Sequence, residues 1–319
     1  MSCSQLVLDQ VDPIDNPGVV PSAHLNQIVG GDSFNSTMDP ADDPAQLSTC
    51  TTCTFPDDLS NYWTPVMFFR ARNVRYKRVT QMGALPDEEA RGGGMTIYYT
   101  APDNDTNNVV AFKKGFRMRT GNPEAQTGEE ASANQSIDYT CLDEEGTPSS
   151  NRSETFPDHM CPGGILTTIY FPPCWDGENL DSPDHYSHVS WPTEGDSTDG
   201  APCPATHPVK IPQVILETRW DTRPYNLEEM WPEDSSQPFL WSFGDDVGSG
   251  PLGDYMFGWK GDALQKAFDS ESCSDQICGL DTQTITEANE CRKDSLSFVD
   301  SGVWSEHLPG MPVDATLGR

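Results

Sequence analysis

The densest group of residues able to do chemistry lies in one segment, PPCWDGENLDSPDHYSHVSWP, from Pro172 to Pro192. Two of the chain's 6 histidines, His185 and His188, stand close together among its acidic residues. A carboxylate that is hydrogen-bonded to an imidazole fixes the tautomer of the ring and raises its basicity. The segment therefore predicts a catalytic acid/base site, a metal site of His and Asp ligands, or a buried polar network that orders a loop.

In the catalytic interpretation, Asp181 or Asp184 is the carboxylate and His185 or His188 is its partner. In the metal interpretation the ligands stay unassigned, and Ca²⁺ is the expected ion if only oxygen atoms bind. No cofactor is otherwise expected. Two further histidines can join the group in space, and these are His24 and His207.

Three aromatic residues extend the candidate site toward carbohydrate recognition. Trp175 and Trp191 flank the acidic and histidine residues, and Tyr62 stands in the run NYWTP. Their faces can stack on sugar rings or pack in the core. Proline and glycine residues place the segment on a loop, where functional side chains commonly lie.

The charge balance excludes several classes of partner. The chain has 319 residues, with 50 Asp and Glu against 19 Lys and Arg, and a formal net charge of −31. Phosphate groups would be repelled, so we expect neither a nucleic-acid binder nor a protein of anionic membrane surfaces. No apolar run is long enough to span a bilayer, and we expect no membrane insertion.

Cysteines and glycosylation sequons indicate an oxidising compartment. Only Cys50 and Cys53 have Cys-x-x-Cys spacing, without a second pair to complete a zinc knuckle, so we predict structural disulfides. The first residues, MSCSQLVLDQ, lack the apolar core of a signal peptide, and we expect a mature secreted product. The cysteines are Cys3, Cys50, Cys53, Cys141, Cys161, Cys174, Cys203, Cys273, Cys278 and Cys291, and the sequons begin at Asn35, Asn104, Asn134 and Asn151.

Short strands separated by turns dominate the pattern of elements. The chain contains 26 Gly and 27 Pro, which favour short strands and loops over long helices. We predict a mainly β single domain over residues 1–319, a β-sandwich or jelly-roll-like fold with long disulfide-tied loops. A polar excursion is expected at about 121–158. Expected strands begin at Val66, Met95, Ile165, Val209 and Pro238, and short C-terminal helices in GDALQKAFD and from Thr286, the first capped by Asp262.

Long motifs in order along the chain resemble one family. They include VDPIDNPGVVPSAHLNQIVGG, CWDGENLDSPDHYSHV, CPATHPVKIPQ and WPEDSSQPFLWSFGD. The chain resembles DUF1996, a family of secreted fungal proteins, some of which carry WSC domains. The resemblance implies an extracellular protein that meets wall polysaccharide. The family's histidines correspond to His24, His185, His188 and His207, whereas Asn26 stands where the family has a further histidine and cannot titrate.

Taken together, the sequence favours a secreted protein that binds or acts on cell-wall polysaccharide of the glucan type. If the protein is a glycoside hydrolase, Asp181 and Asp184 are the acid/base carboxylates, and His24, His185 and His188 position the substrate. Two alternatives stay open: a non-catalytic binding or structural protein, and a metal-dependent hydrolase of another substrate. The expected substrate-binding residues are Trp175, Trp191, Tyr62, His207 and Asn26.

Overall fold

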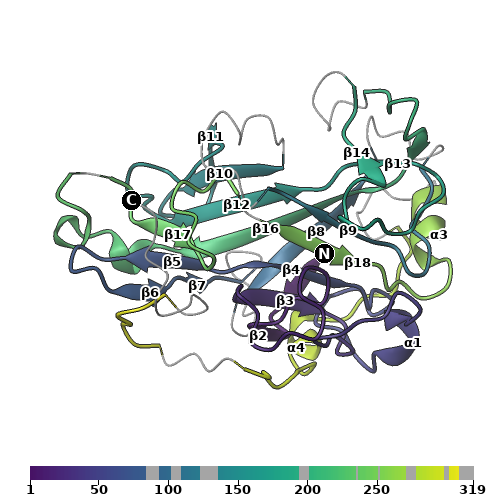
Figure 1. Cartoon of the computed structure of the whole chain (residues 1–319), viewed down its shortest axis with the longest axis horizontal. Coiled ribbons are helices and arrows are strands. Elements are labelled where there is room, and N and C mark those ends of the chain that lie inside the picture. The colour runs from purple at the N-terminus through teal and green to yellow at the C-terminus, as the bar shows by residue number, and fades with distance from the viewer. Residues whose placement is uncertain are drawn as a thin grey trace.

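Two antiparallel sheets form the body of the molecule (Figure 1). The computed structural model describes residues 1–83, 93–101, 109–122, 136–193, 201–234, 236–250, 252–270, 278–297 and 302–308. Strands β12 and β16 run along the long axis of the view in Figure 1. The mainly β architecture with few short helices confirms the predicted fold class.

The larger sheet has seven strands in the order β1-β8-β16-β12-β10-β11, with β7 also paired to β16. Its central strand β16 alternates buried and half-buried residues, so that Val214, Leu216 and Trp220 face the core. The strand bounds are β1 Ser2–Ser4, β7 Thr80–Gln81, β8 Gly94–Thr100, β10 Ile137–Leu142, β11 Pro148–Ser153, β12 Gly164–Tyr170 and β16 Gln213–Asp221.

The second sheet has five strands in the order β2-β3-β4-β18-β9. Neighbours in this order come from both halves of the chain, because β18 lies between β4 and β9. The strand bounds are β2 Val7–Asp9, β3 Asn26–Gly30, β4 Asn61–Pro65, β9 Arg117–Thr120 and β18 Gly253–Met256.

Smaller elements surround the two sheets. The three-stranded sheets follow the orders β17-β5-β6 and β14-β13-β15. Their bounds are β5 Met67–Arg70, β6 Tyr76–Arg78, β13 Cys174–Trp175, β14 Val189–Ser190, β15 Val209–Lys210 and β17 Phe239–Trp241. The helices are α1 Pro44–Leu47, α3 Ala263–Asp269 and α4 Ile285–Ala288, with 3₁₀ turns at Arg223–Tyr225 and Glu228–Met230. No helix in these described segments combines the length and apolar character needed to cross a membrane.

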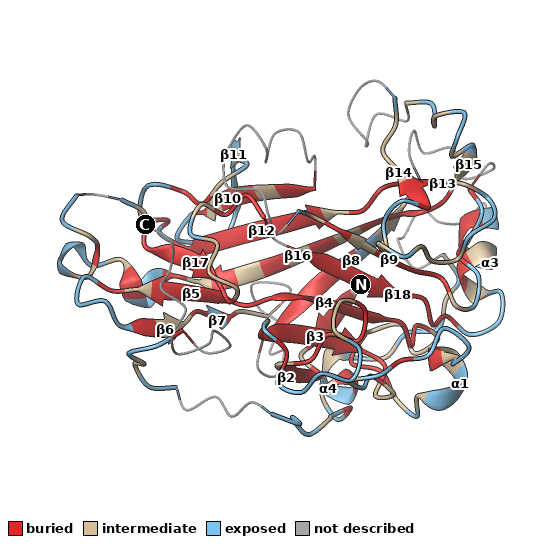
Figure 2. Cartoon of the chain, viewed as in Figure 1, coloured by how far each residue is buried: buried red, intermediate tan, exposed pale blue. Residues whose placement is uncertain are grey.

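The two large sheets contact each other through buried side chains, and most residues of β3, β4, β12 and β18 are buried (Figure 2). Gly253 brings β18 close to β12, because a Cβ added there would lie 2.8 Å from Cγ2 of Ile169. Tyr62 and Tyr255 stack on the same inner face with ring centroids 5.3 Å apart. The hydroxyl of Tyr62 lies 2.5 Å from that of Tyr99, which belongs to the larger sheet.

The opposite face of the five-stranded sheet positions the candidate site. Ile28, Trp63, Asp254 and Arg119 are in register across β3, β4, β18 and β9, and therefore project from the same face. Ile28 and Trp63 belong to a second apolar cluster, together with Val7 and other buried residues. On this face, the buried carboxyl of Asp254 and the guanidinium of Arg119 therefore lie next to the apolar side chains of Ile28 and Trp63.

Four disulfides are described, and they confirm the predicted structural role of the cysteines. The two cysteines of the Cys-x-x-Cys motif each bond to a distant partner, so they are not a pair. Cys278 is also disulfide-bonded, and Cys273 lies outside the described residues. The described pairs are Cys3–Cys53, Cys50–Cys291, Cys141–Cys161 and Cys174–Cys203.

Two local expectations differ from the structure. The described part of the 121–158 excursion contains β10 and β11, because its alternating residues Ile137 and Tyr139 bury one face against the core. Asp262 occupies the N-cap position of α3 but makes no capping hydrogen bond, and instead pairs with Lys266 at 2.7 Å.

Candidate functional site

Asp181 and His185 form the central pair of the acidic and histidine loop. Nδ1 of His185 lies 2.7 Å from Oδ1 of Asp181, and Oδ2 of Asp181 lies 3.7 Å from Nε of Arg117. The side chains of Asp181 and His185 are 23% and 22% exposed, so both reach solvent. His185 has φ of 61°, a left-handed backbone conformation that is uncommon for a residue other than glycine.

His188 is buried and anchors the loop to β9. Its Nε2 donates to the carbonyl oxygen of Arg117 at 2.9 Å, and its Nδ1 lies 2.9 Å from Oγ of Ser182. Burial lowers the pKa of His188, while the hydrogen bond to Arg117 and the nearby carboxylates oppose this shift. Both ring nitrogens are therefore engaged within the protein, and we assign His188 to positioning.

Asp184 closes the turn between the two histidines. Its Oδ1 accepts hydrogen bonds from Oγ of Ser182 at 2.7 Å and from the backbone N–H of Ser187 at 3.0 Å. Burial alone would raise the pKa of Asp184, but these hydrogen bonds outweigh it and hold the pKa well below its usual range. Such a carboxylate stays ionised and orders the loop rather than carrying protons.

The remaining predicted residues of this region brace the loop. Nε2 of His207 donates to the carbonyl oxygen of Ser187 at 3.0 Å. Trp175 is only 4% exposed, and its Nε1 donates to the carbonyl oxygen of Asn179 at 2.5 Å. Trp191 is half-buried. The structure therefore places Trp175 in the core rather than on a ligand-facing surface.

Tyr62 and Asn26 are also buried. Tyr62 is 0% exposed and belongs to the core between the sheets. Nδ2 of Asn26 donates to the carbonyl oxygen of Val11 at 3.1 Å, so the amide fastens the N-terminal loop to β3. Neither side chain offers a surface to a ligand in this structure.

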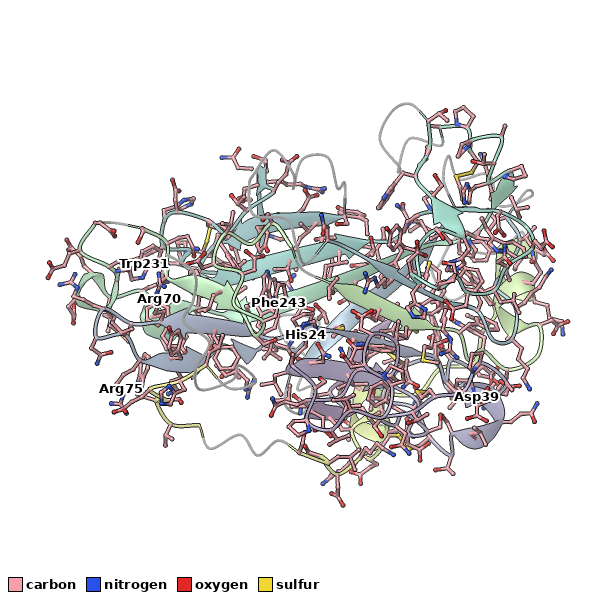
Figure 3. The ribbon with its side chains drawn as sticks, viewed as in Figure 1. His24, Asp39, Arg70, Arg75, Trp231 and Phe243 are labelled. Atoms are coloured by element: carbon pink, nitrogen blue, oxygen red, sulfur yellow. A yellow bond between two sulfur atoms is a disulfide. The ribbon has the colours of Figure 1, made fainter. Side chains whose placement is uncertain are left out.

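His24 lies in a different polar group, over the outer face of the five-stranded sheet. Its ring packs against Phe243 with centroids 5.4 Å apart (Figure 3), and its buried Nδ1 has no hydrogen-bond partner within the described segments. Burial lowers the pKa of His24, opposed by the negative charges of Asp12 and Asp15. His24 is therefore a neutral imidazole beside two carboxyl groups.

Asp254 is as deeply buried as Asp12 of this second group. Both residues are 1% exposed, and Oδ1 of Asp254 has no hydrogen-bond partner among the described residues. Burial, together with the negative charges of Asp12 and Asp15, raises the pKa of Asp254 well above its usual value. Burial also raises the pKa of Asp12, although Asp12 accepts backbone N–H groups of Ile14 and Asp15. Burial thus favours the protonated form of Asp254, while the charge of Arg119 opposes this shift.

Arg119 joins the two polar groups. Its backbone N–H donates to the carbonyl oxygen of His185 at 2.9 Å, and its guanidinium pairs with Asp15. The same guanidinium lies 5.9 Å from the ring centroid of Tyr186, whose side chain is exposed. The loop around His185 and the N-terminal segment around Asp15 therefore meet at one residue of β9.

Sequence reasoning missed Asp12, Asp15, Arg119, Asp254 and Tyr186. A signal was present for the strand residues, since Arg117-Met118-Arg119 alternates charge with an apolar residue and Asp254 interrupts the apolar run LGDYMFGW. A charged residue at a core-facing strand position is uncommon unless it is paired or functional.

Side chains able to hold a metal ion gather at one place in the described part of the chain. The one group of three His, Cys, Asp or Glu side chains found there with ligand atoms within 4.8 Å of one another is Cys141, His159 and Cys161. In the described part of the chain, neither the loop around Asp181 nor the group around His24 brings three such side chains within that distance.

Of the four predicted glycosylation sites, Asn35 and Asn151 are exposed in the structure. Asn104 and Asn134 lie outside the described residues. The two described sites are sterically accessible for modification.

Comparison with known proteins gives one family match. A family model described as "Domain of unknown function (DUF1996)" matches residues 12–259. This range covers every residue of both polar groups, from Asp12 to Asp254. No curated protein and no solved structure matches the chain.

Proposed function

The chain belongs to the DUF1996 family, and we propose that it is a secreted protein that binds neutral wall polysaccharide of the glucan type at the junction of its two polar groups. The observation that carries the proposal is the exposed ring of Tyr186 beside the guanidinium of Arg119. Sugar-binding surfaces combine an aromatic face with polar groups that fix orientation.

The residues around this ring supply the polar groups. Arg119 and Asp15 form an ion pair whose side chains are 20% and 15% exposed. Asp181 and His185 form the second pair. This pair is linked to Arg119, because the carbonyl oxygen of His185 accepts the backbone N–H of Arg119. Carboxylate, imidazole and guanidinium groups can together donate to and accept from sugar hydroxyls.

The charge of the chain favours a neutral ligand. A net charge of −31 repels anionic polysaccharides over the length of a sugar chain. Neutral glucans avoid this repulsion, so binding should depend little on ionic strength.

Secretion is supported by the disulfides and the glycosylation sequons of the chain. Four described disulfides are typical of proteins that fold in an oxidising compartment. The exposed sequons at Asn35 and Asn151 are consistent with passage through a glycosylating pathway.

The experiment is retention of the purified chain on a panel of insoluble fungal and plant glucans. We expect retention on at least one neutral glucan, weakened about tenfold (~1.4 kcal/mol) by Tyr186→Ala and preserved by Tyr186→Phe. Tyr98→Ala is the matched control, because Tyr98 is an exposed tyrosine of the larger sheet. No retention on any glucan, or equal retention of the Tyr186→Ala variant, contradicts the proposal.

A second candidate function is hydrolysis of the bound glycan. The observation that favours it is the pair of Asp181 and His185, because both side chains reach solvent and a carboxylate that is hydrogen-bonded to an imidazole can transfer protons. Reducing ends released by the wild type and lost in both Asp181→Asn and His185→Ala support hydrolysis. Binding without product formation leaves a binding protein, and release of a different product class indicates another hydrolase.

A further inference from the structure

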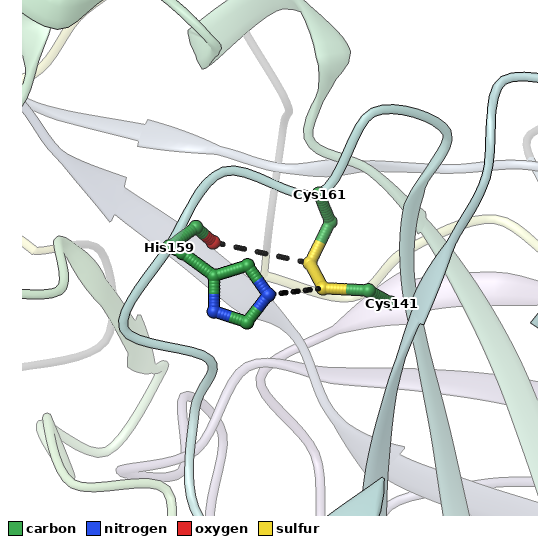
Figure 4. Close-up of side chains that lie close together, drawn as sticks. All are labelled: Cys141, His159 and Cys161. Atoms are coloured by element: carbon green, nitrogen blue, oxygen red, sulfur yellow. Dashed lines mark hydrogen bonds between the residues drawn. A yellow bond between two sulfur atoms is a disulfide. The ribbon is translucent and has the colours of Figure 1, made fainter. Parts of the chain in front are cut away.

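A different group of reactive side chains lies at the disulfide between Cys141 and Cys161. Nε2 of His159 lies 3.4 Å from Sγ of Cys141 (Figure 4). The Nε2 atom and the two sulfur atoms all lie within 4.8 Å of one another. These residues are separate from the proposed polysaccharide site, and the inference does not rest on that function.

The ring of His159 is already oriented as in a metal site. Its Nδ1 lies 3.0 Å from Oδ1 of Asp158, so the N–H is directed to the carboxylate. Nε2 then carries the lone pair, and it faces the sulfur atoms. In zinc sites, a carboxylate commonly accepts a hydrogen bond from one ring nitrogen of a histidine whose other nitrogen binds the metal.

We propose that Cys141, Cys161 and His159 form a Zn²⁺ site when the disulfide is reduced, so that the disulfide and the zinc complex are alternative states of one site. Two thiolates and one imidazole are soft to intermediate ligands that select zinc over calcium or magnesium. A water molecule completes the four-coordinate ion.

The chemistry balances with a dithiol as the reductant. The dithiol gives two electrons and two protons to the Cys141–Cys161 bond, which breaks into two thiols, and the dithiol becomes a cyclic disulfide. Zn²⁺ then displaces one proton from each thiol, forming two Zn–S bonds and one bond to Nε2 of His159. Oxidation of the two thiolates by a disulfide of the same class reverses the change and releases the ion.

The backbone around the site is held by bonds that do not depend on the disulfide. Cys141 lies in β10, opposite Ile165 of β12. The carbonyl oxygen of Cys161 accepts from Nδ2 of Asn226 at 2.8 Å. Reduction therefore leaves both cysteines close together, and the side chain of His159, which is 68% exposed, leaves a path for the ion.

The test uses the full chain, reduced with excess dithiol and transferred without oxygen into Co²⁺ or Zn²⁺. We expect one ion per reduced chain, with a thiolate-to-cobalt absorption band, and none in the oxidised chain. His159→Ala should weaken binding at least tenfold, and Asp158→Asn about 10- to 100-fold. The variant with both Cys141→Ser and Cys161→Ser is the matched control, since its other cysteines are reduced equally.

A second measurement, the alkylation of each cysteine, keeps the test decisive if reduction disturbs the fold. Zinc should protect Cys141 and Cys161 from alkylation, as read by mass spectrometry, while the other cysteines react, and this protection should disappear in His159→Ala. Equal metal content in the wild type and the double serine variant overturns the proposal. Alkylation of these two cysteines at the rate of the others also overturns it.

Discussion

The backbone N–H of Arg119 donates a 2.9 Å hydrogen bond to the carbonyl oxygen of His185. This bond joins β9 to the loop that carries Asp181, while the guanidinium of the same arginine pairs with Asp15. Two segments that are far apart in the sequence therefore share one residue. The geometry of each polar group depends on the other through Arg119.

Replacing Arg119 with lysine tests this coupling. Lys keeps the charge but lacks the planar fork that can pair with Asp15 and face Tyr186 together. We expect Arg119→Lys to weaken glucan retention about three- to tenfold (~0.7–1.4 kcal/mol) with little change in the free energy of unfolding. Lys113→Arg is a control at an exposed position, and retention equal to the wild type in Arg119→Lys would argue against the coupling.

Removing His188 should destabilise the chain rather than change its chemistry. His188→Ala deletes both hydrogen bonds of the buried ring and leaves the carbonyl of Arg117 unpaired. We expect the free energy of unfolding in urea to fall by about 2–4 kcal/mol. His207→Ala removes a half-buried histidine that donates one hydrogen bond to this loop from the segment before β15, and should cost less than about 1 kcal/mol. Similar losses in the two variants would be inconsistent with an anchoring role for His188.

The free energy of unfolding should depend on pH, because Asp58 is buried in the core. This carboxyl accepts a 2.5 Å hydrogen bond from Tyr62, and burial raises the pKa of Asp58 from 3.8 to about 6. The folded protein therefore favours the protonated form of Asp58 more than the unfolded chain does. The contribution of protonated Asp58 to the free energy of unfolding is complete below the pKa of the unfolded chain and is lost as the pH rises from about 4 to about 6.

Asp58→Asn removes this titration while keeping the shape of the side chain. We expect the variant to gain up to about 3 kcal/mol relative to the wild type at pH 8 and to match it at pH 4. Urea unfolding at the two pH values measures the difference. A wild-type advantage at pH 8 would show that the ionised carboxylate is stabilising, contrary to the pKa direction.

Local patterns predicted the strands and one part of the site. The sequence of β16 already shows the alternation of its buried residues. Asp181 and His185 are four positions apart in one loop, so their proximity in the sequence was enough to predict the pair. The Arg119–Asp15 pair spans 104 positions, and only the strand order β2-β3-β4-β18-β9 brings its members together. Nothing in either segment alone encodes that order.

Aromatic and cysteine residues show the same limit. Tyr62 and Trp175 have the composition of a sugar platform, but strand pairing turns both into the core, whereas Tyr186 stays exposed on the loop. The Cys50–Cys291 bond joins residues that are 241 positions apart, and spacing alone cannot assign such a pair.

The most direct measurement is amide hydrogen exchange of the full chain with and without a soluble oligosaccharide of the retained glucan. We predict that slower exchange appears together in residues 181–188 and in residues 12–24, because both segments contact Arg119 or its partners, and that Tyr186→Ala abolishes it in both. Slower exchange in one segment without the other, or only elsewhere in the molecule, would contradict a shared site.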